Sequence, residues 1–278
     1  MKRTRTNWWW LGAFLILSLV IGSGCDSGSS GGGCDTPTPT PTPNGTIFEG
    51  FYTITNMSDL RALAGYTEIT RSLQIVDSDL VNLDGLESLT TIGGSLEMWG
   101  NSALEDIDGL GNLKSVGGGL RIYNNNALSS IDGLSGLTSI QDIDISDSPS
   151  LRDLNGLANL SAIGGRLLIR RMNLDSIEGL RNLTTVGTSV QIQNAGLVNL
   201  NGLEALSNIG ALLTIGPSSA LENIDGLSGL TLVDTLKITD NDSLQSIQGL
   251  NNITTLNGSL TLANNPKLAS ISGLDKPL

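Results

Sequence analysis

A short apolar segment recurs nine times along this chain, at a spacing of 23 or 24 residues. Each copy is a triplet whose first and third residues are apolar and whose middle residue varies. Further apolar residues follow each triplet at intervals of about three. A period of this size predicts a solenoid, in which each turn buries its apolar face only against neighbouring turns. The triplets begin at Leu73, Leu96, Leu120, Ile143, Leu167, Val190, Leu213, Leu236 and Leu260.

The alternation within each triplet predicts a strand with one buried face. Stacked turns would place these strands side by side in a parallel sheet, ~4.8 Å apart. A Gly-Leu pair also recurs once per turn, as at Gly133-Leu134. Such a glycine indicates a corner that needs a positive φ or a close approach of two backbones. We therefore expect a mainly β fold, a single right-handed parallel β-helix or leucine-rich-repeat-like solenoid of about nine turns.

The two ends of the solenoid differ in sequence. Residues 52–54 predict an extra strand, and residues 58–64 predict a short helix with Ser58 as its N-cap. Leu60 and Leu63 of that helix would cover the first turn. No comparable cap follows the last repeat, so we expect an exposed C-terminal turn that either associates end to end with a partner or frays.

Asparagines recur at one position just after the strand, and we expect these amides to be buried. Stacked in successive turns, they would bond to the backbone of the adjacent turns and so play a structural role. They are Asn101, Asn125, Asn241 and Asn265.

The N-terminal region is typical of export. Residues 1–25 combine basic residues, an uncharged run and small residues that lead into Cys25, a pattern typical of a signal peptide. The small residues before Cys25 resemble the lipobox of bacterial lipoproteins, which implies lipidation of Cys25; simple cleavage or a retained anchor are the alternatives. If Cys25 carries no lipid, it could instead pair with Cys34.

Three segments follow from these observations. The signal peptide (1–25) precedes a linker (26–46) that is Gly/Ser-rich and then alternates Thr and Pro, a composition typical of a flexible and then stiff tether. The solenoid occupies 47–278. We expect a lipid-anchored protein of the bacterial cell envelope, in the inner or outer membrane or at the cell surface.

The charge of the chain restricts its partners. The formal net charge is −12, and without the basic residues of the leader 12 Lys and Arg face 27 Asp and Glu, or −15. This acidity argues against nucleic acid as a partner and against adsorption to anionic lipid.

The repeat unit resembles the receptor L-domain, the leucine-rich-repeat-like coil of growth-factor receptor ectodomains and of many bacterial surface proteins. The resemblance covers roughly residues 47–274 and implies a non-enzymatic binding or surface role. It does not carry a ligand over, because one fold hosts many functions. One turn fits the family pattern without gaps: Gly119-Leu120-Arg121-Ile122, Asn125, Leu128, Ile131, Gly133-Leu134, Leu137 and Ile140.

The residue inventory excludes several chemistries. The chain has no histidine and no cysteine after Cys34, which removes histidine-dependent triads and nearly all zinc sites. No phosphate-binding or dinucleotide-binding glycine motif is present, so we expect no cofactor and no metal. Asp84, Asp108 and Asp132 fall in one column before the corner glycines, where they could bind calcium or act as a carboxylate pair. Asn and Gln in the same column favour a turn-capping role instead.

The outward side of the triplet sheet is the candidate binding site. Alternation points Trp99, Arg121 and Tyr123 outward in the second and third turns, and an Arg-Leu-Arg set in the fifth. Trp99 is the only tryptophan outside the leader, and clustered aromatic and arginine side chains are typical of binding hot spots. Such side chains stack on sugars or pair with carboxylates. The expected ligand-binding residues are Trp99, Arg121, Tyr123, Arg166, Leu168 and Arg170.

Three functions remain open. The favoured one is a membrane-tethered, non-enzymatic surface protein that binds a protein or a glycan through this sheet face. The alternatives are a carboxylate-dependent polysaccharide-active enzyme and a purely structural envelope protein. The missing histidine, and the lack of any repeat-breaking loop that could build a cleft, disfavour an enzyme.

Overall fold

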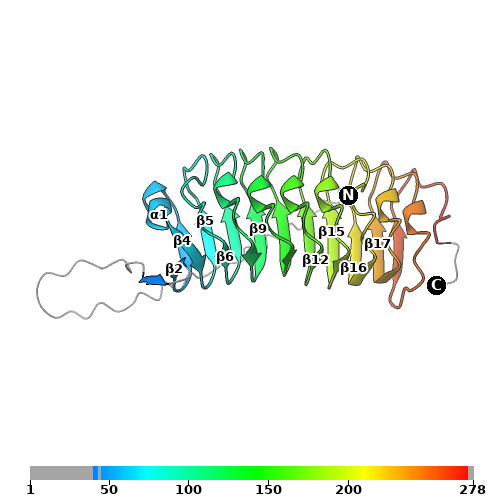
Figure 1. Cartoon of the computed structure of the whole chain (residues 1–278). Coiled ribbons are helices and arrows are strands. Elements are labelled where there is room, and N and C mark those ends of the chain that lie inside the picture. The colour runs from blue at the N-terminus through cyan, green and yellow to red at the C-terminus, as the bar shows by residue number, and fades with distance from the viewer. Residues whose placement is uncertain (1–39, 43–44, 275–278) are drawn as a thin grey trace, which may run out of the picture. The chain divides into compact units, whose positions relative to one another are not determined.

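The computed structural model describes residues 40–42 and 45–274, which lie in one compact unit that runs from Pro39 to Leu278. The predicted signal peptide, Cys25, Cys34 and most of the predicted linker lie outside the described residues. Within the unit the chain winds through successive turns that stack along one axis (Figure 1). No helix in the described ranges is both long and apolar enough to span a bilayer.

The repeated triplets form one parallel sheet, which we call the main sheet. The nine aligned triplets pair residue for residue with their neighbours, as in Leu73 with Leu96 and Leu96 with Leu120. The strands are β3 (Tyr52–Ile54), β5 (Leu73–Val76), β7 (Leu96–Trp99), β9 (Gly119–Tyr123), β11 (Asp142–Ser146), β13 (Leu167–Arg170), β15 (Ser189–Gln193), β16 (Asn208–Ile215), β17 (Leu232–Thr239) and β18 (Leu260–Ala263). The prediction of parallel, in-register strands is confirmed; the handedness of the coil stays a prediction.

Short strands on a second side of each turn form two further ladders. The first contains β1 (Thr40–Thr42), β2 (Gly45–Phe48), β4 (Tyr66–Ile69), β6 (Thr91–Ile92) and β8 (Ser115–Val116). The second contains β10 (Ser139–Ile140), β12 (Ala162–Ile163) and β14 (Thr185–Val186), and it joins the main sheet because the long strand β16 pairs in both. β1 pairs with β2, so the end of the predicted linker belongs to this sheet rather than to a free tether.

The third side of the coil consists of loops and short 3-10 helices. Each of the six described helices contains the recurring Gly-Leu pair, and a Cβ at Gly133 would collide with the Ile107 carbonyl oxygen of the preceding turn. Gly85 instead has a φ of +115°, where only glycine is unstrained, and a Cβ there would meet no atom within 4 Å. The sequence predicted two reasons for a glycine at this corner, a close approach of two backbones or a positive φ. Each reason applies in some of the turns. The helices are η1 (Asp108–Leu110), η2 (Asp132–Leu134), η3 (Asn155–Leu157), η4 (Glu178–Leu180), η5 (Asp225–Leu227) and η6 (Gln248–Leu250).

The predicted capping helix exists, but its N-cap differs. Helix α1 runs from Met57 to Ala62, and the side chain of Asn56 accepts hydrogen bonds from the Ser58 and Asp59 amides. Ser58 is therefore inside the first turn, because an amide two residues earlier takes the cap. Leu60 and Leu63 are buried, so they cover the first turn of the core as expected.

The core is one continuous apolar column between these sides. The first and third triplet residues are at most 4% exposed in the first eight triplets. In the last described turn Leu260 and Ile271 are 41% and 62% exposed, because no further turn covers them in the described chain. The expected exposure of the last turn is confirmed, and an association through it is untested.

Candidate functional site

The outward side of the main sheet carries columns of side chains, each built from one residue per turn, and two of them hold the candidate site. The middle residues of the triplets form the central column, in which Glu97 pairs with Arg121 and Asp144 pairs with Leu168 in the sheet register. Residues two positions later form the next column, in which Trp99 pairs with Tyr123. Because neighbouring turns are 23 or 24 residues apart, this face brings together residues that are distant in sequence.

Trp99 and Tyr123 form a stacked aromatic pair. Their ring centroids are 6.0 Å apart and their planes differ by 3°, so the two rings lie parallel. Both side chains are half-buried. Partial burial raises the pKa of the Tyr123 hydroxyl, and the nearby Glu97 carboxylate adds to the rise. The pair therefore joins two adjacent turns through stacked rings, and it places a tyrosine hydroxyl on this face.

An ion pair lies beside the rings. The Arg121 guanidinium contacts the Glu97 carboxylate, and the Gln74 amide donates to the same carboxylate at 3.0 Å. Arg121 is therefore held in place by the turn before it. Its charge is largely neutralised by Glu97, so its remaining N–H groups offer hydrogen bonds rather than a free cation.

Two further arginines are also paired across turns. Arg170 Nη2 lies 3.1 and 3.0 Å from the two carboxylate oxygens of Asp144. Arg171 donates to both oxygens of Asp147 at 2.6 Å, and these bonds hold the pKa of Asp147 below its usual value. Arg171 also has a φ of +51°, which is uncommon for a long side chain. The face is thus a lattice of ion pairs rather than an open cationic patch.

Leu168 and Arg166 depart from the expected site in opposite ways. Leu168 lies in the outward column but is only 5% exposed, so the expectation of an exposed contact residue is wrong. The guanidinium of Arg170 reaches back to Asp144, the residue paired with Leu168, and long side chains of this kind cover apolar neighbours. Arg166 is exposed and forms no ion pair with any residue in the described ranges.

The carboxylates that complete this lattice are the site residues that the sequence reasoning missed. Glu97, Asp144 and Asp147 each precede their arginine partner by 24 or 26 residues. The repeat alignment itself contained the signal, because it places Glu97 and Arg121 in the same column of adjacent turns.

Buried amides support the face from below, as predicted. Asn125 Oδ1 accepts from the backbone N–H and the side-chain amide of Asn101 at 3.1 and 3.0 Å. Asn101 Nδ2 in turn donates to the Ile75 carbonyl. Asn241 and Asn265 repeat the arrangement near the other end. In the four turns between them the position is taken by Ser148, Met172, Ala195 and Ser218, so the amide ladder is interrupted there.

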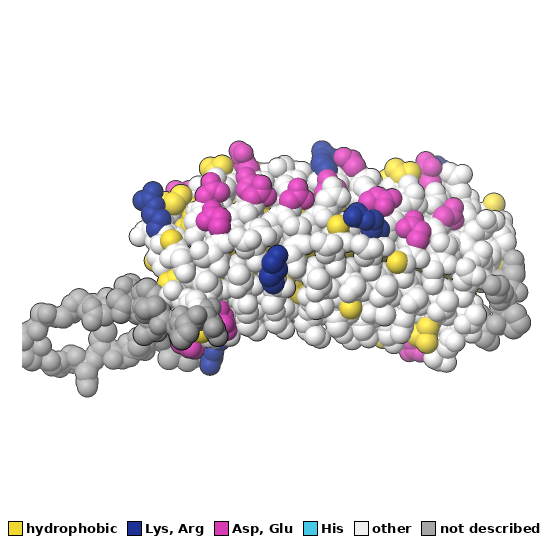
Figure 2. All heavy atoms as spheres, in the orientation of Figure 1, with side chains coloured by type: hydrophobic (Ala, Val, Ile, Leu, Met, Phe, Trp, Pro, Cys, Tyr) yellow, Lys and Arg dark blue, Asp and Glu magenta, His cyan; other side chains and the backbone are white. Residues whose placement is uncertain are grey.

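The carboxylates of Asp84, Asp108 and Asp132 lie in one column of successive turns. No group of three acidic, cysteine or histidine side chains within the described residues could hold an ion. The capping role belongs to side chains two residues earlier, since Asp106 Oδ1 accepts from the Asp108 N–H and Ser130 Oγ from the Asp132 N–H. Partial burial raises the pKa of Asp108, and the carboxylates around it raise it further. Figure 2 shows acidic side chains gathered along the upper edge of this view.

Comparisons with known proteins identify a structural likeness only. No family model matches the sequence, and no curated protein matches it. A crystal structure of an internalin (inlF) from Listeria monocytogenes aligns with this chain at a TM-score of 0.45 and 20% sequence identity. The alignment covers 80% of this chain and 63% of the internalin chain. Membership of the receptor L-domain family therefore stays a prediction.

Proposed function

We propose that this protein is a non-enzymatic surface protein that binds a protein partner through the outward side of its main sheet. The observation that carries the proposal is the stacked Trp99–Tyr123 pair on an otherwise flat sheet. Aromatic and arginine anchors dominate the energy of protein interfaces, and tyrosine and arginine are enriched there. The site residues are Trp99, Arg121, Tyr123, Arg166 and Arg170.

The orientation of the rings favours a protein over a glycan. A sugar stacks on the open face of an aromatic ring, whereas here one face of each ring is covered by the other ring. The faces that the two rings turn toward each other are therefore not open to a sugar. A glycan partner stays the second candidate, because Arg166 is exposed and could pair with an acidic sugar.

The ion pairs support the same proposal through preorganisation. Arg121 and Arg170 are fixed by Glu97 and Asp144 before a partner arrives, so fewer rotamers are lost on binding. Their carboxylates also keep the face nearly neutral, which lets a partner of either charge approach. An enzyme would need an unpaired, oriented carboxylate, and Glu97 and Asp144 are already committed to arginines.

A photo-crosslinking experiment tests the binding face. We expect a photoreactive phenylalanine analogue at position 123 of the full chain to crosslink a protein from envelope extracts. Trp99→Ala with Arg170→Ala should lower capture by about thirtyfold, the effect of losing a hot spot worth ~2 kcal/mol. The matched control places the probe at Gln191, in the same sheet. Equal crosslinking from positions 123 and 191, or capture that survives both substitutions, would refute the proposal, and retention on acidic glycans alone would favour the second candidate.

The membrane tether is part of the proposal. We expect Cys25 to carry the lipid, so that cells fed an alkyne-tagged fatty acid label the protein. Cys25→Ala should abolish the label, whereas Cys34→Ala is the matched control and should keep it. A label that persists without Cys25 would place the anchor elsewhere.

The last described turn supports a further contact with a second copy. Leu260 and Ile271 are exposed there, while α1 covers the other end of the core. An end-to-end pair would therefore join two C-terminal turns rather than one of each end. Light scattering should find a dimer that Ile271→Asp converts to a monomer; a monomeric parent protein would remove this contact.

A further inference from the structure

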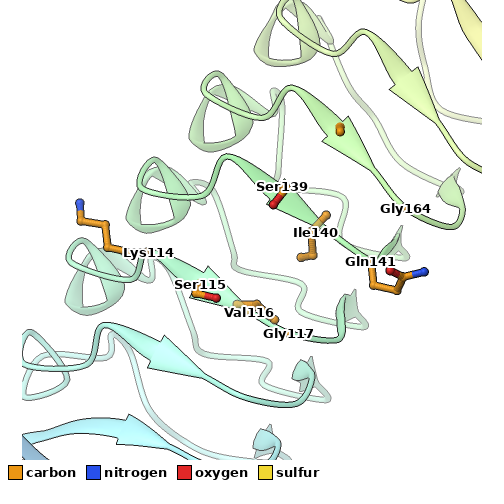
Figure 3. Close-up of a pocket in the computed structure, with 9 residues that line it drawn as sticks. Lys114, Ser115, Val116, Gly117, Ser139, Ile140, Gln141 and Gly164 are labelled. Carbon is orange, nitrogen blue, oxygen red and sulfur yellow. The ribbon is translucent and has the colours of Figure 1, made fainter.

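A hollow of about 360 Å³ interrupts the second side of the coil, away from the main sheet. Figure 3 shows it between β8 and β10, with Lys114 and Gln141 at opposite ends and Ser139 and Ile140 between them. A volume of this size lies within the ~300–1,000 Å³ of small-molecule sites. The hollow is lined by Lys114, Ser115, Val116, Gly117, Ser139, Ile140, Gln141, Ala162 and Gly164.

The hollow exists because two neighbouring strands do not pair. β6 pairs with β8 and β10 pairs with β12, but β8 and β10 form no ladder. Near the gap, one backbone hydrogen bond joins the two turns, from the Gln141 N–H to the Gly118 carbonyl. In the preceding pair of turns the equivalent bond runs from the Gly117 N–H to the Ile92 carbonyl. The accepting carbonyl has thus shifted along the chain. Backbone groups at the gap therefore lack the inter-turn hydrogen bonds that other described turns make.

The sequence explains the slip. Only Gln141 and Asp142 separate Ile140 from the next buried residue, whereas three residues separate Ile92 from Leu96. The corner of this turn is therefore one residue short. A second short corner follows Val233, but there β16 and β17 stay paired through a shift in register.

Lys114 supplies the charge beside the hollow. Its column otherwise carries Ser or Thr, whose hydroxyls bond to the carbonyl of the preceding turn, as Thr90 does to Thr67 and Ser161 to Thr138. Lys114 makes no such bond and no ion pair within the described residues, so a free ammonium replaces a structural hydroxyl. Figure 3 shows its side chain extending outward at one end of the hollow. Its flexible stem can bring the ammonium over the hollow.

The core is also slightly opened at this point. Val116 and Ile140 are 4% and 5% exposed, while Ile92 and Ile163 in the same column are at most 1% exposed. The floor is thus apolar, and the rim carries hydroxyls, an amide and a cation. Some Cα atoms of β8 and β10 lie within 8 Å, less than the ~9.6 Å that an inserted strand would require. A peptide strand therefore does not fit, and a small polar ligand does.

We propose that this hollow binds an anionic sugar ring of the uronic acid class. Its carboxylate would pair with Lys114, and its hydroxyls would bond to Ser115, Ser139, Gln141 and the unpaired backbone groups. Its apolar face would lie on Val116 and Ile140. This second site is independent of the aromatic pair on the main sheet.

Saturation-transfer NMR on the full chain tests the proposal with galacturonate, galactose and acetate. We expect galacturonate to bind more tightly than galactose, and acetate not to bind. Lys114→Thr restores the hydroxyl column and should weaken galacturonate up to about fivefold, with galactose unchanged. Lys237→Thr is the matched control, an exposed lysine of the main sheet, and should change neither affinity.

A glycine inserted between Gln141 and Asp142 restores the longer corner and should abolish binding of both sugars. Equal loss with Lys237→Thr, acetate binding as tight as galacturonate, or no saturation transfer from the parent chain would each overturn the proposal. If the inserted glycine disturbs folding, as read by circular dichroism, the two lysine substitutions decide. Trp99→Ala should leave sugar binding intact, which separates this site from the protein-binding face.

Discussion

The main sheet has two halves that share an interior and differ on their outward side. From β7 to β13 the face carries the Trp99–Tyr123 pair and arginines held by carboxylates. From β15 to β17 the same columns carry Gln191, Thr214 and Lys237, and no ion pair among the described residues joins them. The pairing of the triplets and the burial of their first and third residues continue unchanged. The difference shows that the same buried core tolerates either outward surface.

The shared interior gives the largest expected effect. Ile122 and Ile215 are both fully buried, one beneath each half. Ile122→Ala and Ile215→Ala should each lower the free energy of unfolding by about 2–5 kcal/mol, through lost burial and a cavity. Guanidinium denaturation followed by circular dichroism measures both. A difference between them well above ~1 kcal/mol would mean that the outward face does contribute to the fold.

The buried amides give the next effect. Asn125→Ala removes the acceptor for two N–H groups of Asn101 and the donor to the Met98 carbonyl. Buried groups left without partners should cost about 1–3 kcal/mol of unfolding free energy. Asn112→Ala is the matched control, because its exposed amide bonds only to the Glu87 carbonyl. It should change stability by less than ~0.5 kcal/mol. Equal losses would show that the amide ladder is not structural.

The ion pairs should matter less to stability than to binding. A double-mutant cycle with Asp144→Ala and Arg170→Ala should give a coupling of about 0.2–1 kcal/mol that shrinks at high salt. The same cycle on Thr214 and Lys237, in the other half, should give no coupling. A coupling several times larger would make the lattice a structural element rather than a preorganised surface.

The smallest effect is a dependence on pH. Arg171 lowers the pKa of Asp147 in the folded protein, so this pair contributes stability above the ordinary value of 3.8 and loses it as the pH falls through the lowered one. Arg171→Asn suits the positive φ and removes the ion pair. Its stability should fall less steeply than that of the parent protein in acid below pH 3.8. Parallel pH profiles of thermal melting for the two proteins would contradict this.

The repeat predicted most of the fold but only part of the candidate site. The triplet alignment predicted the register of Leu96 with Leu120, because a fixed period forces equivalent residues to stack. It also placed Trp99 beside Tyr123. It did not predict that Leu168 is covered, since that depends on where the Arg170 side chain lies.

The N-cap of α1 and the gap between β8 and β10 differ from the expected fold, and each difference arises from a few neighbouring residues. Asn56 took the cap expected of Ser58, because the two lie two residues apart and both side chains suit the position. The gap between β8 and β10 was missed because one absent residue near Gln141 hardly disturbs a period of 23 or 24.

By itself the sequence determined the stack of turns, the buried columns and which residues face outward, because alternation and period act through the backbone alone. Only the tertiary structure decided which outward charges are paired, which side chains are covered and where a strand ladder opens. These depend on side-chain rotamers and corner lengths in turns that meet across 23 or 24 residues. The chemistry available to a partner is set at that second level.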